Sequence, residues 1–321
     1  MPGLSHRALR NTPRAGRGFT LIEIMVALAL TSVLVFGLVE LFVSTTKNAR
    51  GANSLMEIQE NGRTALQIIN SDVRRLGYFA GLIDVGLVSG TSGIADVSAS
   101  PCAAGDTTWS RGLNQPLFGL NDPSTVNTVY PCISNAEHGT GDVLVVRYTP
   151  AVPVDTSAMI SGRPYLRTGL RSNRGALFLG SAQANADNDV SDATAESFPL
   201  VAHAYYVGPS GRSCEGIATP SLWRKSISDT GVPVSQELVP GVERFQVRFL
   251  EGERYFNANA VTNWDNVRAV EVQMLVRTTC PETGYVNDNT FTLGGTITSF
   301  TPNDGFRRQV LTSVTSIRNR G

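Results

Sequence analysis

The first feature of the sequence is an apolar run from Phe19 to Val43, with no charged side chain between residues 24 and 39. At about 1.5 Å of rise per residue, a helix over this run is long enough to cross a hydrocarbon layer of about 30 Å. Glu23 lies near the start of the run. A carboxylate at that depth costs about 2.5–3.5 kcal/mol, so the pattern predicts a membrane-spanning helix whose acid has a partner or a purpose.

After the apolar run the pattern becomes amphipathic, with apolar residues recurring at three- and four-residue steps or their multiples. This stripe comprises Leu55, Ile58, Leu66, Ile69, Val73 and Leu76. The opposite, polar face comprises Lys47, Arg50, Glu57, Glu60, Arg63, Asp72 and Arg74. No proline interrupts residues 19–78, and Gly77 is a natural C-terminal stop. We therefore expect one long helix, weakest at Gly51 and Gly62, whose apolar stripe packs against a globular head.

Strand patterns follow in the second half of the chain. The clearest are residues 242–249 and 267–277, where apolar and polar residues alternate as in half-buried antiparallel strands. Further candidates are residues 141–148 (opened by a Gly-Asp turn), 176–179, 202–207, 221–225 and 306–319. Residues 81–135 are rich in Gly, Ser, Asn and Asp, which predicts a loop-rich region with little core of its own. The predicted fold class is α+β, with a long N-terminal helix packed on an antiparallel β-sheet head.

The charge of the chain is balanced, with 27 basic and 27 acidic residues. Residues 1–18 hold four arginines and no acid, so their removal would leave a net charge of −4. This balance argues against nucleic-acid binding on bulk charge. Because positive flanks stay in the cytoplasm, the arginines predict an N-terminus inside and an exported remainder.

Cys102, Cys132, Cys214 and Cys280 all lie in the part predicted to be exported. An even number of cysteines in an oxidising compartment indicates disulfides, and four cysteines allow three pairings. Their spacing favours Cys102–Cys132 and Cys214–Cys280. No two have the short spacing of a zinc knuckle and histidine is scarce, so we expect neither a metal–thiolate site nor a cofactor.

The sequence contains no constellation of residues that indicates an enzyme. His203 lies in an alternating strand beside tyrosines, where we expect a structural role, and the tryptophans (Trp109, Trp223 and Trp264) are expected to pack. Asp187, Asp189 and Asp192 have the acid density of a calcium loop, but the fixed Gly and terminal Glu of an EF-hand are missing. These three acids are a calcium candidate, with a solvated surface loop as the default interpretation.

Residues 18–23, Gly-Phe-Thr-Leu-Ile-Glu, follow a basic leader and open the apolar helix. This arrangement resembles the prepilin cleavage and methylation signal of type IV pilins and type II secretion pseudopilins. The resemblance implies that a prepilin peptidase cuts between Gly18 and Phe19 and then N-methylates the Phe19 amine. It also implies that Glu23, then the fifth residue, pairs with the terminal amine of a neighbouring subunit. The alternatives are an uncleaved signal anchor and a secretory signal peptide, and no small-residue cleavage site supports the latter.

The strand region narrows the resemblance. Tyr-Tyr-Val at 205–207, Leu-Trp-Arg at 222–224 and the strands at 242–249 and 267–277 are similar, in this order, to PilW-type minor pilins. The ending, with Arg307-Arg308 and later Ile317-Arg318-Asn319, is similar to the arginine-bearing final strand of those proteins. J-type pseudopilins share the leader and the Val-Glu-Arg-Phe strand and are the close competitor. Residues 81–200 carry no such resemblance.

The resemblance implies a leader at 1–18, a transmembrane or filament-core half-helix at 19–43, an amphipathic half at 44–77 and a periplasmic head at 78–321. The implied protein is a minor pilin that spans the inner membrane once and then joins a pilus at the cell surface. Its implied partners are the prepilin peptidase, the other minor pilins and the major pilin, in a priming or tip complex. The alternative functions are a J-type pseudopilin of a type II secretion system, or a tip adhesin or ligand-binding module that uses residues 81–200.

Overall fold

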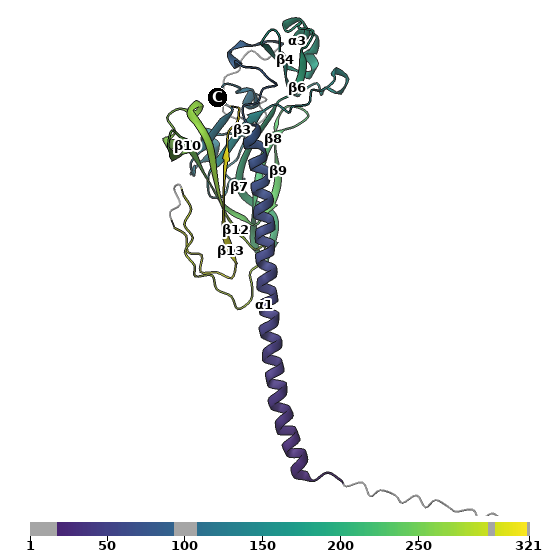
Figure 1. Cartoon of the computed structure of the whole chain (residues 1–321), viewed down its shortest axis with the longest axis vertical. Helices are drawn as coiled ribbons and strands as arrows, with labels where there is room; N and C mark the ends of the chain where they lie inside the picture. The colour runs from purple at the N-terminus through teal and green to yellow at the C-terminus, as the bar shows by residue number, and fades with distance from the viewer. Residues whose placement is uncertain (1–17, 93–107, 295–298, 320–321) are drawn as a thin grey trace, which may run out of the picture. The chain divides into compact units, whose positions relative to one another are not determined.

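The structure, a computed structural model, describes residues 18–92, 108–294 and 299–319 (Figure 1). The chain comprises two compact units, Met1–Asn53 and Ser54–Gly321. Helix α1, Leu21–Arg75, continues from the first unit into the second without a break at Gly51 or Gly62. It ends before Gly77, whose backbone φ of +73° lies in the left-handed region that favours glycine.

In the first unit, α1 exposes its large apolar side chains along the run from Phe19 to Val43. Among the described residues, α1 is the helix that is long and apolar enough to cross a membrane, judged by length and composition. None of the most apolar 18-residue stretch of α1 is buried within the structure. In water this surface would be unfavourable at about 25 cal/mol per Å², so it requires an apolar environment.

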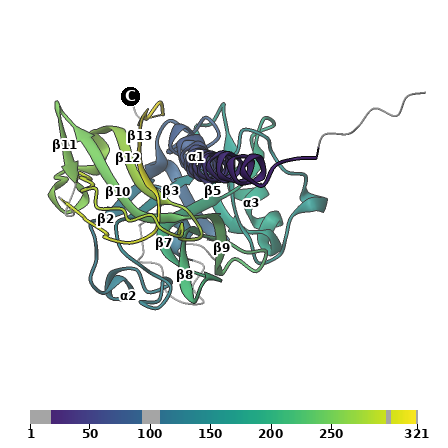
Figure 2. The ribbon, with the colours of Figure 1, turned by 90° about the horizontal axis from the view of Figure 1, so that it is seen from below.

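The second unit contains three sheets within the described part of the chain (Figure 2). The first has the strand order β11-β10-β12-β13 and is antiparallel throughout. Its strands are β10 (Val242–Glu251), β11 (Arg254–Asn257), β12 (Val267–Arg277) and β13 (Arg308–Ser316). The strands predicted at 242–249 and 267–277 correspond to β10 and β12, which pair with each other.

The second sheet has the order β2-β3-β7-β8-β9 and is also antiparallel. Its strands are β2 (Leu117–Leu120), β3 (Val143–Tyr148), β7 (Val201–Cys214), β8 (Ile217–Ile227) and β9 (Pro233–Pro240). The strand predicted to end near Gly208 is longer than expected, because β7 pairs with β8 as far as Cys214. Glu215 and Gly216 have φ values of +53° and +78°, as a tight hairpin turn requires.

The third sheet has the order β1-β5-β4-β6, with β1 and β5 parallel. Its strands are β1 (Val88–Ser92), β4 (Pro164–Gly169), β5 (Arg174–Leu179) and β6 (Glu196–Pro199). Two short α-helices accompany the sheets, α2 (Val126–Val129) and α3 (Gln183–Asp189). Single 3-10 turns lie at Val85–Leu87, Thr108–Arg111, Thr156–Ala158, Gly180–Ala182, Ala258–Ala260 and Trp264–Asn266.

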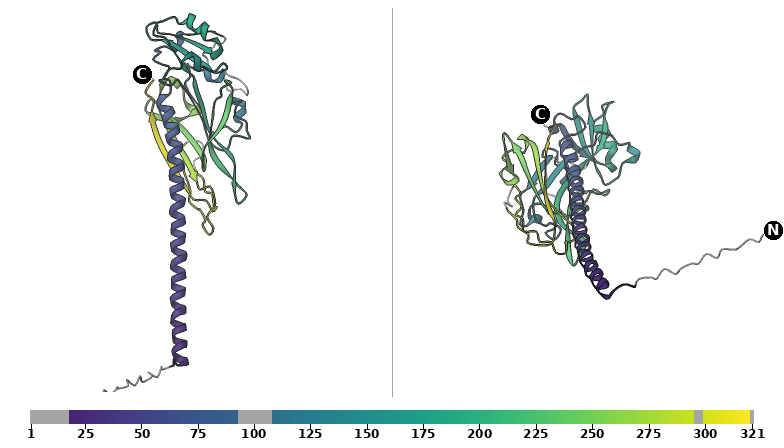
Figure 3. Two further views of the ribbon diagram at one scale, coloured as in Figure 1. Left: turned by 90° about the vertical axis from the view of Figure 1, so that its right-hand side faces the viewer. Right: turned by 60° about the horizontal axis from the view of Figure 1, so that its bottom comes forward.

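The second half of α1 runs beside β13 and supplies part of the main core (Figure 3). Four side chains of α1 in this core are fully buried, Ile58, Ala65, Ile69 and Val73, and so is Leu76 directly after the helix. Each large one contributes about 1.5–3 kcal/mol relative to exposure. Two assignments on this helix were wrong. Leu55, placed on the apolar stripe, is 42% exposed, whereas Asp72, placed on the polar face, is only 5% exposed.

Gly62 is a close-packing position of α1 and not a weak point. A Cβ atom there would lie 2.7 Å from Leu311 Cδ1 and 3.3 Å from Val276 Cγ2. The missing side chain therefore lets the helix backbone approach β12 and β13 closely.

Residues 81–135, which we expected to have little core of their own, contribute buried side chains to a core that they share with other segments. Trp109, Val126, Tyr130 and Ile133 are buried and join a second apolar cluster on β3 and β7. These side chains gather from separate loops onto one sheet face, which local apolar density does not reveal. Trp109 is fully buried, while Trp223 and Trp264 are half-buried.

Gly141 opens β3 at a point where two backbones nearly touch. Its φ is +121°, and a Cβ atom there would lie 2.2 Å from the carbonyl oxygen of Phe245. The same carbonyl accepts a hydrogen bond from the Asp142 N–H at 2.8 Å. The Asp142 carboxylate in turn accepts from the Val247 N–H at 2.7 Å, so this Gly-Asp pair joins β3 to β10.

The substitution Gly141→Ala should therefore lower the free energy of unfolding by about 3 kcal/mol or more, because the new methyl group must displace backbone. Urea unfolding of the full chain in detergent, followed by tryptophan fluorescence, measures the loss. Gly211→Ala is the matched control, because no heavy atom lies within 4 Å of a Cβ at that position. We expect it to stay within about 0.5 kcal/mol of the parent. Equal stability of the two variants would contradict the close approach at Gly141.

Candidate functional site

The candidate processing and assembly residues lie at the start of α1. Thr20 directly precedes the helix, and its backbone N–H and its hydroxyl each donate to Glu23 Oε2 at 2.9 Å. The Glu23 N–H donates back to Thr20 Oγ1 at 3.3 Å. This reciprocal arrangement is a capping box, which satisfies two of the free N–H groups at a helix start. Thr20 therefore has a role that we did not assign from the sequence, although Thr and Glu three residues apart before an apolar run are its signal.

The surface around Glu23 belongs entirely to the first unit. A groove of about 380 Å³ follows one side of the helix and is lined by Phe19, Glu23, Ile24, Ala27, Leu28 and Thr31. Four-residue steps on the helix place Glu23, Ala27 and Thr31 above one another. The side chains beyond Glu23 on this line are small, so another helix could approach the carboxylate closely.

Gly18 and Phe19 are accessible. No heavy atom lies within 4 Å of a Cβ built on Gly18, and Phe19 is 83% exposed. The bond between them is therefore open to an enzyme that binds an extended chain.

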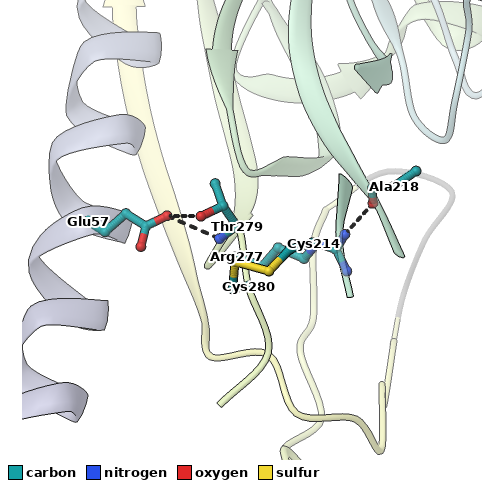
Figure 4. Close-up of a disulfide and its surroundings, with 6 residues drawn as sticks. All are labelled: Glu57, Cys214, Ala218, Arg277, Thr279 and Cys280. Atoms are coloured by element: carbon teal, nitrogen blue, oxygen red, sulfur yellow. Dashed lines mark hydrogen bonds between the residues drawn. A yellow bond between two sulfur atoms is a disulfide. The ribbon is translucent and has the colours of Figure 1, made fainter. Parts of the chain in front are cut away.

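A disulfide joins Cys214, at the end of β7, to Cys280, shortly after β12, with a Cα–Cα distance of 5.3 Å (Figure 4). This is the pairing that the spacing favoured. The neighbouring Thr279 donates its N–H and its hydroxyl to Glu57 of α1, at 3.0 and 2.8 Å. The bridge and this contact hold the β7–β8 hairpin, the end of β12 and α1 together, and such a disulfide typically contributes about 2–4 kcal/mol.

The other favoured pair involves Cys102, which lies outside the described residues. Its predicted partner Cys132 is buried in the second apolar cluster. The pairing Cys102–Cys132 stays a prediction.

The three acids of the calcium candidate do not converge. Asp187 lies on α3, accepts a hydrogen bond from Gln183 and forms an ion pair with Arg167 at 3.2 Å. The Asp192 carboxylate accepts N–H groups from a loop, and hydrogen bonds from the N–H and hydroxyl of Thr194 lower its pKa to about 2. No group of three or more His, Cys, Asp or Glu side chains in the described residues is arranged to hold a metal ion, and Asp189 belongs to no such group.

The buried Asp72 connects α1 to the second sheet. Its Oδ1 accepts the Tyr148 hydroxyl of β3 at 2.8 Å, and its Oδ2 accepts the Tyr205 hydroxyl of β7 at 2.5 Å. His203 Nδ1 also lies 2.5 Å from Oδ2. His203 thus has a structural contact, as the sequence indicated. Burial lowers the pKa of His203 although Asp72 opposes the shift, which fits a neutral imidazole that donates its Nδ1–H to the carboxylate.

The arginines of the final strand differ in their surroundings. Arg308 of β13 has a side chain that is only 1% exposed, and it forms paired hydrogen bonds with both Glu243 and Asp304. Arg307, directly before β13, pairs with Glu282, and both side chains are half-buried. Two carboxylates around one buried guanidinium satisfy its charge, so Arg308 fixes the start of β13.

Residues 204–319 match the family described as Type IV Pilus-assembly protein W, and residues 13–39 match the prokaryotic N-terminal methylation motif. The first match begins in β7 and includes all of β13, and the second includes Gly18, Phe19 and Glu23. The C-terminal part of the chain is therefore similar to the PilW family, and its N-terminal part to the methylation motif.

The pilin-like protein PilA3 of Thermus thermophilus is 36% identical over 61 residues. The match covers 19% of this chain and 26% of that protein, so the chain spans about a quarter of the relative's length. The solved structure of the type IV-like pilin TTHA1219 from Thermus thermophilus aligns with a TM-score of 0.38 and 12% identity. That alignment covers 82% of this chain and 97% of the other, and it is too distant to add to the fold described above.

The substitution Asp72→Ala should lower the free energy of unfolding by about 3–5 kcal/mol, because it leaves His203, Tyr148 and Tyr205 without their shared acceptor. Asp229→Ala is the matched control, since the Asp229 side chain is 79% exposed. Chemical unfolding of both full-length variants gives the comparison. A loss for Asp72→Ala no greater than that of the control would show that the buried carboxylate does not hold α1 to the sheet.

Proposed function

We propose that this chain is a minor pilin of a type IV pilus that acts in a priming or tip complex. The observation that carries the proposal is the start of α1, where an accessible Gly18–Phe19 bond precedes a methylation-type motif and Glu23 lies on an otherwise apolar face. A prepilin peptidase would cut this bond and N-methylate Phe19. The chain would then act as a structural subunit and not as an enzyme.

Glu23 supplies the assembly step of this proposal. In an apolar environment the attraction between a carboxylate and an ammonium group is stronger than in water, and an unpaired charge is penalised. The Thr20 hydrogen bonds give the carboxylate a partner within its own chain before assembly. The freed amine of a neighbouring Phe19 would replace or extend these bonds and fix the axial register between subunits.

The topology follows from the charges around the apolar run. We propose residues 1–18 as the leader, 19–43 as the inner-membrane or filament-core segment, 44–77 as the amphipathic half of the helix and 78–321 as the periplasmic head. The leader arginines stay cytoplasmic, so one crossing places the head outside. After assembly the chain would lie in a pilus at the cell surface.

The remaining partners would be the other minor pilins and the major pilin. A J-type pseudopilin of a type II secretion system is the second candidate, because it would use the same leader and helix. The match over residues 204–319 favours the pilus. A tip adhesin or ligand-binding module that uses residues 81–200 is a third candidate, because this segment lies outside both family matches. Co-purification of the full chain with co-expressed minor pilins, compared with pseudopilins, would distinguish the two assemblies.

The substitution Gly18→Val should leave the full-length precursor in the membrane, because any side chain at this position obstructs the peptidase. Immunoblotting of cells that co-express the peptidase detects the difference in length. Gly37→Val is the control, because this glycine also has open space around it but lies beyond the motif. Cleavage of the Gly18 variant at the parental rate would show that the cut is elsewhere.

The substitution Glu23→Gln should leave processing largely intact but reduce incorporation into sheared pili at least about tenfold, because the amide cannot pair with an ammonium charge. Glu40→Gln removes a carboxylate from the same helix outside the motif and should assemble like the parent. The ratio of chain in the pilus fraction to chain in the membrane measures both. Normal assembly of the Glu23 variant would exclude the proposed charge pair.

A further inference from the structure

A small cavity in the head lies next to His203 and has no part in the proposed assembly function. Its volume is about 180 Å³, and all its lining residues belong to the second unit. It is lined by the last turn of α1, by β3 and β7, by the end of β8 and by the segment before β4. The polar lining residues are Arg75, Tyr148, Arg163, His203 and Ser226.

The charged groups of this lining are cationic. Arg75 and Arg163 both line the cavity, and no acid is among its described lining residues. The acid paired with Arg163 is Asp229, and the distance of 4.0 Å between Nη1 and Oδ1 is the longest that counts as an ion pair. The Asp229 side chain is 79% exposed. The Nε atom of Arg163 is buried and has no hydrogen-bond partner. A buried guanidinium N–H without an acceptor is costly, so this arrangement favours an oxyanion that would supply one.

The contact with Asp72 orients the imidazole of His203. Asp72 occupies Nδ1, and because His203 lines the cavity, Nε2 is the ring nitrogen that can contact a ligand there. The register of β7 and β8 pairs Ala204 with Lys225, so Ser226 lies opposite His203. Directly opposite residues share a sheet face, and the Ser226 hydroxyl therefore adds a donor beside the ring.

We propose that this cavity binds a small oxyanion, either a carboxylate or a tetrahedral anion such as sulfate or phosphate, through Arg75, Arg163, Ser226 and the Nε2 atom of His203. The cavity is smaller than the about 300 Å³ at which pockets for drug-sized ligands begin, so it suits a single anionic group. That group could be free in solution or part of a larger molecule. The proposal does not depend on the role in pilus assembly.

Binding of an anion should bring a proton with it. Burial lowers the pKa of His203, so the empty cavity favours the neutral ring. A bound anion would favour the imidazolium, in which Nε2 becomes a donor. The charged and titratable groups that face the ring are Asp72 and Arg75 of α1, Tyr148 of β3, Tyr205 of β7, Arg224 of β8, and Arg163. Asp72 is the acid of this set, and its charge is already shared by three donors, so the added negative charge comes from the ligand.

Isothermal titration of the full chain in detergent with sodium acetate and with sodium sulfate tests the proposal. Neither anion changes its charge between about pH 6 and about pH 7.5, so any pH dependence comes from the protein. We expect saturable binding of at least one anion with a Kd of about 1 mM or tighter. Affinity should rise as the pH falls, by up to about tenfold per pH unit. The anion that binds more tightly identifies the ligand class, and no saturable binding of either would overturn the proposal.

Three variants locate the site. Arg163→Gln should weaken binding at least about tenfold, because a charge-assisted contact is lost. His203→Asn places an amide nitrogen near the position of Nδ1, retaining a donor to Asp72 while removing Nε2, and should abolish the pH dependence. Ser226→Val adds a methyl group to the cavity in place of a hydroxyl and should also weaken binding. It provides a second test if the arginine variant is unstable.

Arg171→Gln is the matched control, because Arg171 is exposed and does not line the cavity. It should bind like the parent, and thermal unfolding without anion should be unchanged for both arginine variants. Parental affinity in both Arg163→Gln and Ser226→Val would place the anion elsewhere. An unchanged pH dependence in His203→Asn would remove His203 from the site.

Discussion

The constraint on which the account depends is the cost of an ionised carboxylate on an apolar helix face. Glu23 lies in the first turn of α1, where large apolar side chains are exposed on all sides. The capping box with Thr20 offsets part of this cost inside one chain, and the positive end of the helix dipole also favours an acid there. Both contributions are available to a single chain, so they let the helix form before assembly. They do not neutralise the charge, which leaves the carboxylate attractive to an amine of another chain.

The second half of α1 has a different environment, because it forms part of the main core of the second unit. Here the helix buries apolar side chains such as Ile69 and Val73, and it carries Asp72 into the same interface. An apolar stripe alone tolerates small rotations or slips of the helix. Three hydrogen-bond donors on two strands can all reach the carboxylate in only one position of the helix. Asp72 therefore fixes the register of the helix on the second sheet. Asn70 adds contacts to Ser313 and Thr315 of β13 on the first sheet.

The local pattern of apolar and polar residues predicted those elements that this pattern alone specifies, and it missed contacts between residues far apart in sequence. The second half of α1, β10 and β12 follow from periodicity, because each buries one face, whereas the first half of α1 follows from its continuous apolar run. Asp72 was assigned to the polar face because it is charged. Its burial could not be seen from local pattern, since its partners Tyr148 and Tyr205 lie 76 and 133 residues away in sequence. The third sheet was largely missed because its strands are only four to six residues long. At the candidate site, the sequence motif identified Gly18, Phe19 and Glu23. The capping role of Thr20 was recognised only from its hydrogen bonds with Glu23 in the structure.

The capping box, the exposed Gly18–Phe19 bond and the apolar face all bear on the proposed cleavage that would release a new N-terminus at Phe19. Intact-mass spectrometry of the chain purified from membranes, after co-expression with a prepilin peptidase, measures that event directly. We expect a mass that lacks residues 1–18 and carries one added methyl group. A mass that retains those residues would contradict it, because Glu23 would then have no freed amine to meet.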